Sequence, residues 1–141
     1  MVNDGKMDAY STNVSCSDCV CIVFVCLILV EIIEMIYLAS PYTHESKSVM
    51  EYRFREAAKA AGRLMKEGHI VFSPICHTHP IKVECDLPPD FDYWEKYDSW
   101  FIFQADKIVV LKLMGWDRSK GVKAEIEMAE RLGKPVEYIE P

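Results

Sequence analysis

Glu125 is the first residue whose position indicates chemistry. It lies in a predicted helix that begins at Ser119, a good N-cap, and ends at Gly133, a usual C-terminal stop. Residues three, four and seven apart share a helix face, so Glu125 falls at the border of the apolar face and Glu127 on the charged face. The apolar face is expected to contain Val122, Ile126, Ala129 and Leu132. A carboxylate at such a border either extends outward to an ion pair or serves catalysis.

Asp98 is a second carboxylate in an apolar setting. It lies in a predicted helix that begins at Asp90 or Asp92 and ends near residue 104. It interrupts an apolar stripe with 3-4-3-4 spacing, formed by Phe91, Trp94, Phe101 and Ala105. One interpretation is a core aspartate that a backbone amide or a tyrosine hydroxyl satisfies. The other is a catalytic acid.

Taken together, the two carboxylates favour displacement at a sugar carbon. In such a reaction one carboxylate attacks the anomeric carbon and the other manages the proton of the leaving group. Burial and like-charge proximity would separate their pKa values, so that Glu125 stays ionised while Asp98 holds a proton, or the reverse.

The elements around Glu125 form a predicted βαβ unit. An apolar run at 107–113 and a shorter one at 135–139 flank the helix, and both are typical of buried strands. The two strands should be parallel with a right-handed crossover. Ligands in such sheets bind beyond the carboxyl ends of the strands, where residues 116–121 would lie.

The preceding chain repeats the same alternation. Strands are expected at 35–39 and 69–73, with a helix from Ser46 or Ser48 to Gly68 between them. Loops are expected at 40–44 and 74–80, followed by an irregular connection at 82–90. This order predicts an α/β fold: a flavodoxin/Rossmann-like three-layer sandwich with a four- to five-stranded parallel sheet, formed by residues 35–141.

The amino-acid composition of the chain argues against some classes of partner. The 141 residues carry a formal net charge of −6 without a basic block, which argues against a nucleic-acid polymer as partner. Half of the residues are hydrophobic, which argues against disorder. Four of the six cysteines lie in the first 34 residues, so the rest of the chain is interpreted as reduced and cytoplasmic.

Residues 1–34 are predicted to lie outside the fold. They are polar at first and then apolar from Val20 to Val30, a run shorter than the roughly 20 residues of a membrane span. The acidic start and the lack of a small-residue cleavage site do not fit a signal peptide. We favour an upstream extension with Met35 as the natural start, and a membrane anchor is the alternative.

No metal site is predicted. The cluster Cys16-x-x-Cys19-x-Cys21 has no matching second half. His77 and His79 would point the same way in an extended segment, but a third ligand is not evident. One of these histidines is expected to bind a base or a phosphate instead.

Several segments resemble one known family. In chain order they are Tyr37-Leu-Ala-Ser-Pro41-Tyr42, Gly68-His-Ile-Val-Phe-Ser-Pro74, Asp98 ahead of Ala105-Asp106-Lys-Ile-Val-Val, Ser119-x-Gly121-x-x-x-Glu125, and Leu132-Gly-Lys-Pro-Val136. Their order and spacing resemble the nucleoside 2-deoxyribosyltransferase superfamily, and within it a group of small proteins that share domain of unknown function 1937. Trp116 and the segment from His77 to Pro80 are typical of that group.

The resemblance implies roles for particular residues. Glu125 would be the nucleophile that forms a covalent deoxyribosyl-enzyme, Asp98 would bind or protonate the base, and Tyr37 would orient the nucleophile. Ser119 would contact the sugar or a 5′-phosphate, beside the amides of a helix N-terminus. The remaining candidates for substrate binding are Ser40, Pro41, Tyr42, Ser73, His77, His79, Trp116, Asp117 and Gly121. Arg53, Arg55 and Arg118 are candidates to neutralise a phosphate.

Two functions are therefore expected from the sequence. The first is cleavage or transfer at the N-glycosidic bond of a deoxynucleoside or its 5′-monophosphate, through a glycosyl-Glu125 intermediate. The second is a non-catalytic module that binds or senses a nucleotide in the same crevice. No cofactor is expected. The resemblance and the aromatic helix around Asp98 imply a homodimer or a higher homo-oligomer.

Overall fold

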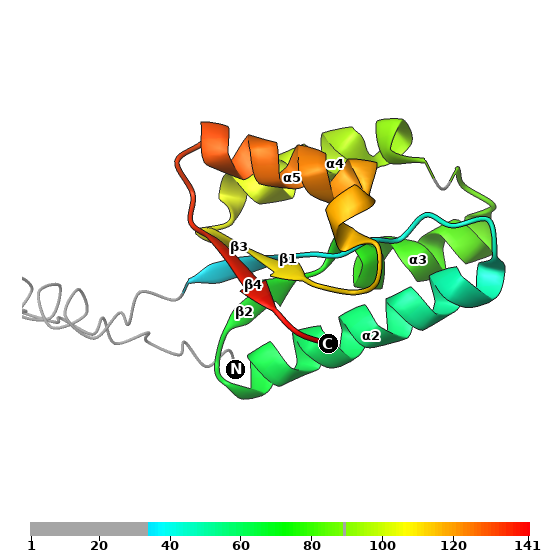
Figure 1. Ribbon diagram of the computed structural model, residues 1–141, viewed down its shortest axis with the longest axis horizontal. Coiled ribbons are helices and arrows are strands. Elements are labelled where there is room, and N and C mark those ends of the chain that lie inside the picture. Colours follow the sequence, from blue (N-terminus) through cyan, green and yellow to red (C-terminus); the bar gives the residue numbers. More distant parts are fainter. Residues whose placement is uncertain (1–33, 89) are drawn as a thin grey trace, which may run out of the picture. The chain divides into compact units, whose positions relative to one another are not determined.

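The fold is built on a four-stranded parallel sheet. The structure is a computed structural model and describes residues 34–88 and 90–141. The strands are β1 (Met35–Ala39), β2 (Ile70–Phe72), β3 (Lys107–Leu111) and β4 (Val136–Ile139), in the order β2-β1-β3-β4 (Figure 1). Tyr37 of β1 pairs with Phe72 on one side and with Ile108 on the other. The predicted parallel α/β class is confirmed, with four strands.

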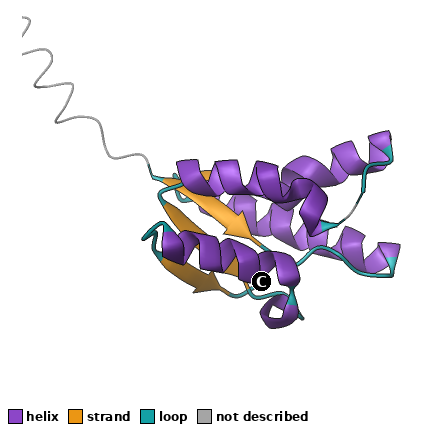
Figure 2. Ribbon diagram, turned by 90° about the horizontal axis from the view of Figure 1, so that it is seen from above, coloured by secondary structure: helices purple, strands orange, loops and turns teal. Residues whose placement is uncertain are grey.

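The helices form a layer on each side of the sheet. They are α2 (Lys47–Lys66), α3 (Pro74–Cys85), α4 (Phe91–Gln104) and α5 (Lys120–Arg131), with a short 3-10 turn, η1 (Trp116–Arg118). Helices α4 and α5 cover one face, while α2 and α3 lie on the other (Figures 1 and 2). This is the three-layer sandwich that the alternation of strands and helices predicts.

Successive side chains of the inner strands point to opposite faces and build two cores. Tyr37 and Ala39 of β1 pack with Val122 and Ala129 of α5 in the first core. The alternate residues, Ile36 and Leu38, pack with Ala60 and Ala61 of α2 in the second core. The small alanines allow α2 to approach the sheet closely. The inner strands are thus buried on both sides, as in other parallel sheets.

Helix α5 has the start and the face that its sequence predicts. The Ser119 side chain accepts a hydrogen bond from the amide of Val122 at 3.4 Å, as an N-cap does. Gly133 follows the helix with a φ of 66°, a left-handed conformation that suits glycine. The prediction was wrong for Leu132, which is 42% exposed. Leu132 is the C-cap, so it lies beyond the part of the helix that packs on the sheet.

The predicted loop at 74–80 was wrong, because Pro74–Cys85 is the helix α3. The irregular connection predicted at 82–90 was wrong for residues 82–85, which belong to the same helix, while residues 86–88 and 90 are irregular. Ser73 caps the helix and accepts a hydrogen bond from the amide of Cys76, and Pro74 occupies the first turn, where a missing N–H costs nothing. Pro80 is tolerated inside the helix. Residues two apart on a helix differ by about 200° in direction, so the side chains of His77 and His79 cannot point the same way.

No helix in residues 34–88 and 90–141 is long and apolar enough to cross a membrane. The apolar run from Val20 to Val30 and the cluster Cys16-x-x-Cys19-x-Cys21 lie outside the described residues. The predicted extension over residues 1–34 therefore stays a prediction, apart from Glu34, which is exposed and directly precedes β1.

Candidate active site

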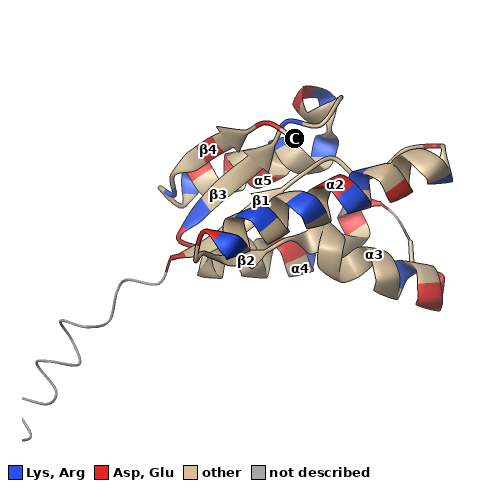
Figure 3. Cartoon of the chain, turned by 90° about the horizontal axis from the view of Figure 1, so that it is seen from below, with Lys and Arg blue, Asp and Glu red and all other residues tan. Residues whose placement is uncertain are grey.

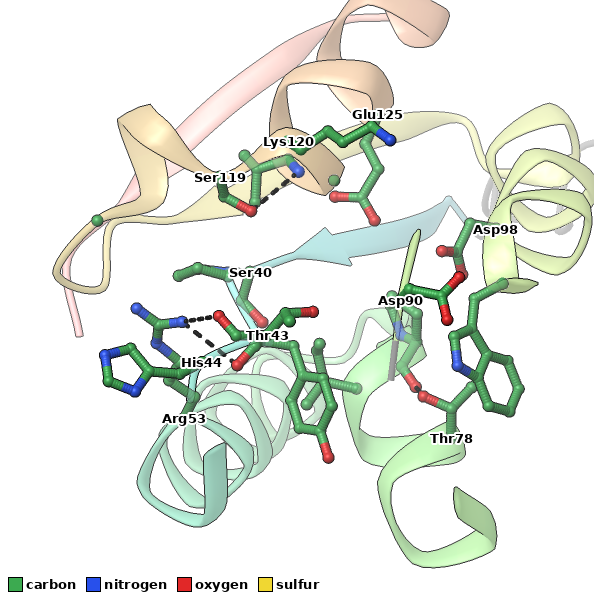
Figure 4. A pocket seen from close by; sticks show the side chains of 18 of the residues that line it. Ser40, Thr43, His44, Arg53, Thr78, Asp90, Asp98, Ser119, Lys120 and Glu125 are labelled. Atoms are coloured by element: carbon green, nitrogen blue, oxygen red, sulfur yellow. Dashed lines mark hydrogen bonds between the residues drawn. The ribbon is translucent and has the colours of Figure 1, made fainter. Parts of the chain in front are cut away.

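A cavity of about 640 Å³ opens at the carboxyl edge of the sheet. The loop after β1 lines it with residues 40–44, and the segment after β3 lines it from Met114 to Val122, with Trp116 and Asp117 excepted. Helices α3 and α4 close the opposite side (Figure 4). This is the edge where parallel α/β sheets bind ligands, and the volume is in the range of small-molecule sites.

Glu125 lies in the wall of the cavity and is 6% exposed. Helix α5 directs its side chain toward the space between β1 and α4 (Figure 4). One carboxylate oxygen, Oε1, accepts a hydrogen bond of 2.7 Å from the Tyr37 hydroxyl. The other, Oε2, is buried and has no hydrogen-bond partner among the described residues. Glu125 is therefore oriented by one oxygen, while its second oxygen lies buried without a hydrogen bond.

Asp98 faces the same space from α4 and is 8% exposed. The fully buried Tyr37 lies on the central strand beneath both helices, and its hydroxyl interacts with Asp98 as well as with Glu125. On the same helices, Glu127 of α5 is exposed, and so are Asp92 and Glu95 of α4. The helix-face argument therefore selected the acids that are buried. The tyrosine hydroxyl that the sequence allowed for Asp98 acts on its pKa, while the hydrogen bond that this hydroxyl donates goes to Glu125.

Burial raises the pKa values of Asp98, Glu125 and Tyr37. It raises the pKa of Asp98 to about 7, against a lowering effect of Tyr37. Burial, followed by repulsion from Asp98, raises the pKa of Glu125 to about 8, and the hydrogen bond from Tyr37 again opposes the rise. The pKa of Tyr37 is raised well above 10, mainly by burial, so its hydroxyl keeps its proton. The two carboxyls titrate as a coupled pair that retains a proton near neutral pH.

Ser40 and Ser119 lie on the rim close to the ends of β1 and β3 (Figure 4). Ser40 is 5% exposed, and its hydroxyl has no hydrogen-bond partner among the described residues. Ser119 is the N-cap of α5 and Gly121 lies in its first turn, where the positive end of the helix dipole favours an anion. Pro41 and Tyr42 also line the cavity, so the structure brings these predicted residues together with Glu125 and Asp98.

Other predicted residues lie elsewhere. Ser73 is buried as the N-cap of α3, and His77 lines a second cavity of about 140 Å³ on the far side of Asp98. The ring of Trp116 packs against Tyr138, 5.4 Å between centroids, and against the first core. Asp117 is exposed on η1. None of these four lines the main cavity.

His79 contacts Tyr42 rather than the cavity. Its Nδ1 atom lies 2.8 Å from the Tyr42 hydroxyl, and its Nε2 atom lies 3.1 Å from Oε2 of Glu51. Its ring is stacked on Phe54 at 4.3 Å. The predicted contact between a histidine and a ligand therefore has no support from the position of this ring.

The three arginines that are candidates for phosphate binding lie in different places. Arg53 and Arg118 line the cavity. Arg55 instead pairs with Glu51 at 2.8 Å and belongs to a basic stripe on the outer side of α2, seen in Figure 3. The stripe consists of Arg55, Lys59, Arg63 and Lys66.

Sequence reasoning missed the contribution of α3 to the cavity. Pro74, Thr78 and Lys82 all line it at i, i+4 and i+8 spacing. That spacing could have indicated a shared face, but it places the three side chains together only if the segment is a helix. Asp92 and Trp94 of α4 also line the cavity, and Asp92 pairs at its mouth with Lys120 of α5 at 2.8 Å.

The described part of the chain contains no group of three or more His, Cys, Asp or Glu side chains that could hold a metal ion. The main cavity offers two buried carboxyls, the tyrosine hydroxyl bonded to one of them, and a helix N-terminus. Such a set can supply a nucleophile, a proton and hydrogen bonds to an anion.

Comparison with known proteins agrees with this architecture. A solved structure of the 2-deoxyribosyltransferase from the psychrotolerant bacterium Bacillus psychrosaccharolyticus matches with a TM-score of 0.52 and 30% sequence identity. The match covers 76% of this chain and 72% of the bacterial enzyme. A search of curated protein sequences gives no match.

The fold and the match define the class as nucleoside 2-deoxyribosyltransferase-like. Residues 34–140 match the model of the family described as Domain of unknown function (DUF1937). The chain belongs to that family, within the 2-deoxyribosyltransferase-like class, as the sequence motifs indicated.

Proposed function

We propose that this protein cleaves or transfers the N-glycosidic bond of a deoxynucleoside or a deoxynucleoside 5′-monophosphate. The observation that carries the proposal is Glu125, buried in the cavity wall with Oε1 held by Tyr37 and Oε2 unpartnered. A free oxygen on an oriented carboxylate suits attack on an anomeric carbon. The similarity to a 2-deoxyribosyltransferase supports the same chemistry.

In the first step, Oε2 of ionised Glu125 forms a bond to C1′ of the sugar. The bond between C1′ and the base nitrogen breaks, and its electron pair stays on the base. Asp98 in its protonated form gives its proton to the departing base, a role that its raised pKa supports. The products are a glycosyl ester on Glu125 and a free base.

In the second step, an acceptor attacks C1′ of the ester and releases Glu125. If the acceptor is the nitrogen of another base, the reaction is a transfer, and if it is water, the reaction is a hydrolysis. Asp98 takes up the proton of the acceptor in either case. Both displacements invert C1′, so the overall configuration is retained.

Recognition of the substrate is divided between the two sides of the cavity. Asp98 and Trp94 on α4 would contact the base, and Ser40, Ser119 and Gly121 would contact the sugar or its phosphate. The positive end of the helix dipole at the start of α5 supports an anionic group on that side. A small-molecule nucleoside or nucleotide is the proposed partner, while the homodimer and the cytoplasmic location stay predictions.

The test is base release from a panel of deoxynucleosides and their 5′-monophosphates, followed by chromatography. Release by the wild type that disappears in Glu125→Gln would support the proposal. Glu127→Gln is the matched control, since Glu127 is exposed on the same helix and should retain activity. Adding a second base separates transfer from hydrolysis. Mass spectrometry of quenched enzyme should find one deoxyribosyl group on the peptide that contains Glu125.

A binding module is the second candidate, because the pKa of Glu125 is raised to about 8 and the protonated acid cannot attack. It predicts tight binding of a panel member with no release of base at any pH between 6 and 9. Release that depends on Glu125 would exclude it.

A further inference from the structure

Arg53 joins the two loops that flank the main cavity. It extends from α2, and its Nη1 atom donates hydrogen bonds to the carbonyl oxygens of Thr43 at 2.9 Å and Tyr42 at 3.3 Å (Figure 4). Its Nη2 atom donates to the carbonyl oxygen of Met114 at 3.1 Å. Tyr42 and Thr43 follow β1, whereas Met114 follows β3, and all three line the cavity. One guanidinium thus connects segments that are more than 60 residues apart in the chain.

The turn next to Met114 allows the guanidinium of Arg53 to approach the backbone closely. Gly115 has a φ of 88°, a left-handed conformation that a residue with a side chain rarely adopts. A Cβ atom at this position would lie 3.4 Å from Nη2 of Arg53, so the guanidinium is packed directly against the turn. The planar guanidinium has five N–H donors in a fixed arrangement, and three hydrogen bonds go to the two loops.

A second set of contacts holds the same loop after β1. The Tyr42 hydroxyl bonds His79 of α3, and His79 in turn contacts Glu51 of α2. The ring of His79 also stacks on the ring of Phe54. Tyr42 is therefore held through its carbonyl by Arg53 and through its side chain by His79.

We propose that Arg53 is a positioning residue that sets the spacing of the two loops, and that the Tyr42–His79–Glu51 chain supports it. Arg53 would shape the cavity for its ligand rather than bind an anionic ligand itself. The identity of that ligand rests on the proposed function, but the coupling of the loops does not.

The coupling is tested by amide hydrogen exchange on the full chain without ligand. Arg53→Lys keeps the charge but lacks the planar fork that reaches both loops. The amides of residues 42–44 and 113–116 should both exchange about tenfold faster, at an unchanged melting temperature. Arg63→Lys is the control, because Arg63 lies on the same helix and donates to a carbonyl, that of Glu140, at 3.2 Å. Faster exchange in one loop only, or in neither, would overturn the proposal.

A binding experiment separates positioning from anion recognition. Calorimetry with 2′-deoxyadenosine and its 5′-monophosphate should find both ligands weakened by a similar factor, about tenfold, in Arg53→Lys and in Arg53→Ala. A loss confined to the monophosphate in Arg53→Ala, with full affinity in Arg53→Lys, would identify a phosphate ligand and contradict positioning. If the wild type binds neither compound, adenine deoxynucleosides are not its ligands, while hydrogen exchange still decides the role of Arg53.

Discussion

Tyr37 connects the two acids at the residue scale. Its hydroxyl donates to Glu125 at 2.7 Å and interacts with Asp98, and its own pKa is raised, so it stays protonated. A hydrogen bond to a carboxylate favours the charged form. The proposed reaction needs Glu125 ionised and Asp98 protonated, although the pKa of Glu125 is the higher of the two. Because Tyr37 lowers the pKa of both acids, ligand contacts to Asp98 would have to produce the reversal.

We therefore expect Tyr37→Phe to shift the pH dependence of base release. Without the donor, the pKa of Glu125 should rise by about one unit, since a hydrogen bond to a charged group is worth about 1.5 kcal/mol. The acid limb of the pH–rate profile should move to higher pH by the same amount, and the rate at pH 6 should fall about tenfold. Tyr97→Phe is the control, because Tyr97 is 47% exposed on α4. An equal loss at every pH would contradict this role.

The buried acids also predict how stability depends on pH. Their pKa values in the fold, about 7 and about 8, lie above the ordinary values of 3.8 and 4.5. Between about pH 4 and pH 8 the folded state binds more protons than the unfolded state, so the free energy of unfolding falls as pH rises. The shift of Asp98 alone corresponds to a loss on the order of 4 kcal/mol if it acts in full.

Glu125→Gln should flatten that fall, because the amide is neutral at every pH. We expect the variant to be more stable than the wild type at pH 8 and to differ less at pH 4, as measured by urea unfolding. Glu127→Gln should follow the wild-type curve. Parallel curves for Glu125→Gln and the wild type would show that Glu125 is not the group that titrates.

At the scale of single elements, the sequence was informative where periodicity and caps agree. The face of α5 and the interrupted stripe of α4 were enough to select Glu125 and Asp98. Helix α3 was not predicted, because its sequence contains two prolines and has no amphipathic pattern. Pro74 is compatible with a helix start as well as with a loop, and only the hydrogen bond that the Cys76 amide donates to the Ser73 hydroxyl distinguishes the two. The contacts of Arg53 could not be predicted, because they join α2 to loops that sequence spacing does not relate.

The cap of α3 predicts a measurable stability difference. Ser73→Ala should lower the free energy of unfolding by up to about 1 kcal/mol, because the amide of Cys76 loses its acceptor. Ser46→Ala is a matched control at the N-cap of α2, where the serine makes no side-chain cap bond. Equal losses in urea unfolding for the two variants would show that the cap bond at Ser73 contributes nothing.

At the scale of the whole molecule, the fold of the described residues coincides with the span of the family match. The four strands and both cores lie between Met35 and Ile139, and the family match begins at residue 34. Strand β1 is central, since it pairs with both β2 and β3. Met35, at its start, exchanges hydrogen bonds in both directions with Asp106, the residue before β3. The β1 strand therefore sets a sharp limit to truncation.

A fragment of residues 34–141 should accordingly keep the melting temperature of the full chain within about 2 °C, and bind nucleosides with the same affinity. A fragment of residues 40–141 should fail to fold, because removing β1 leaves β2 without a neighbour and exposes both cores. Thermal melts followed by circular dichroism decide both points. A clear drop in the melting temperature of the 34–141 fragment would mean that residues 1–33 stabilise the domain and are more than an upstream extension.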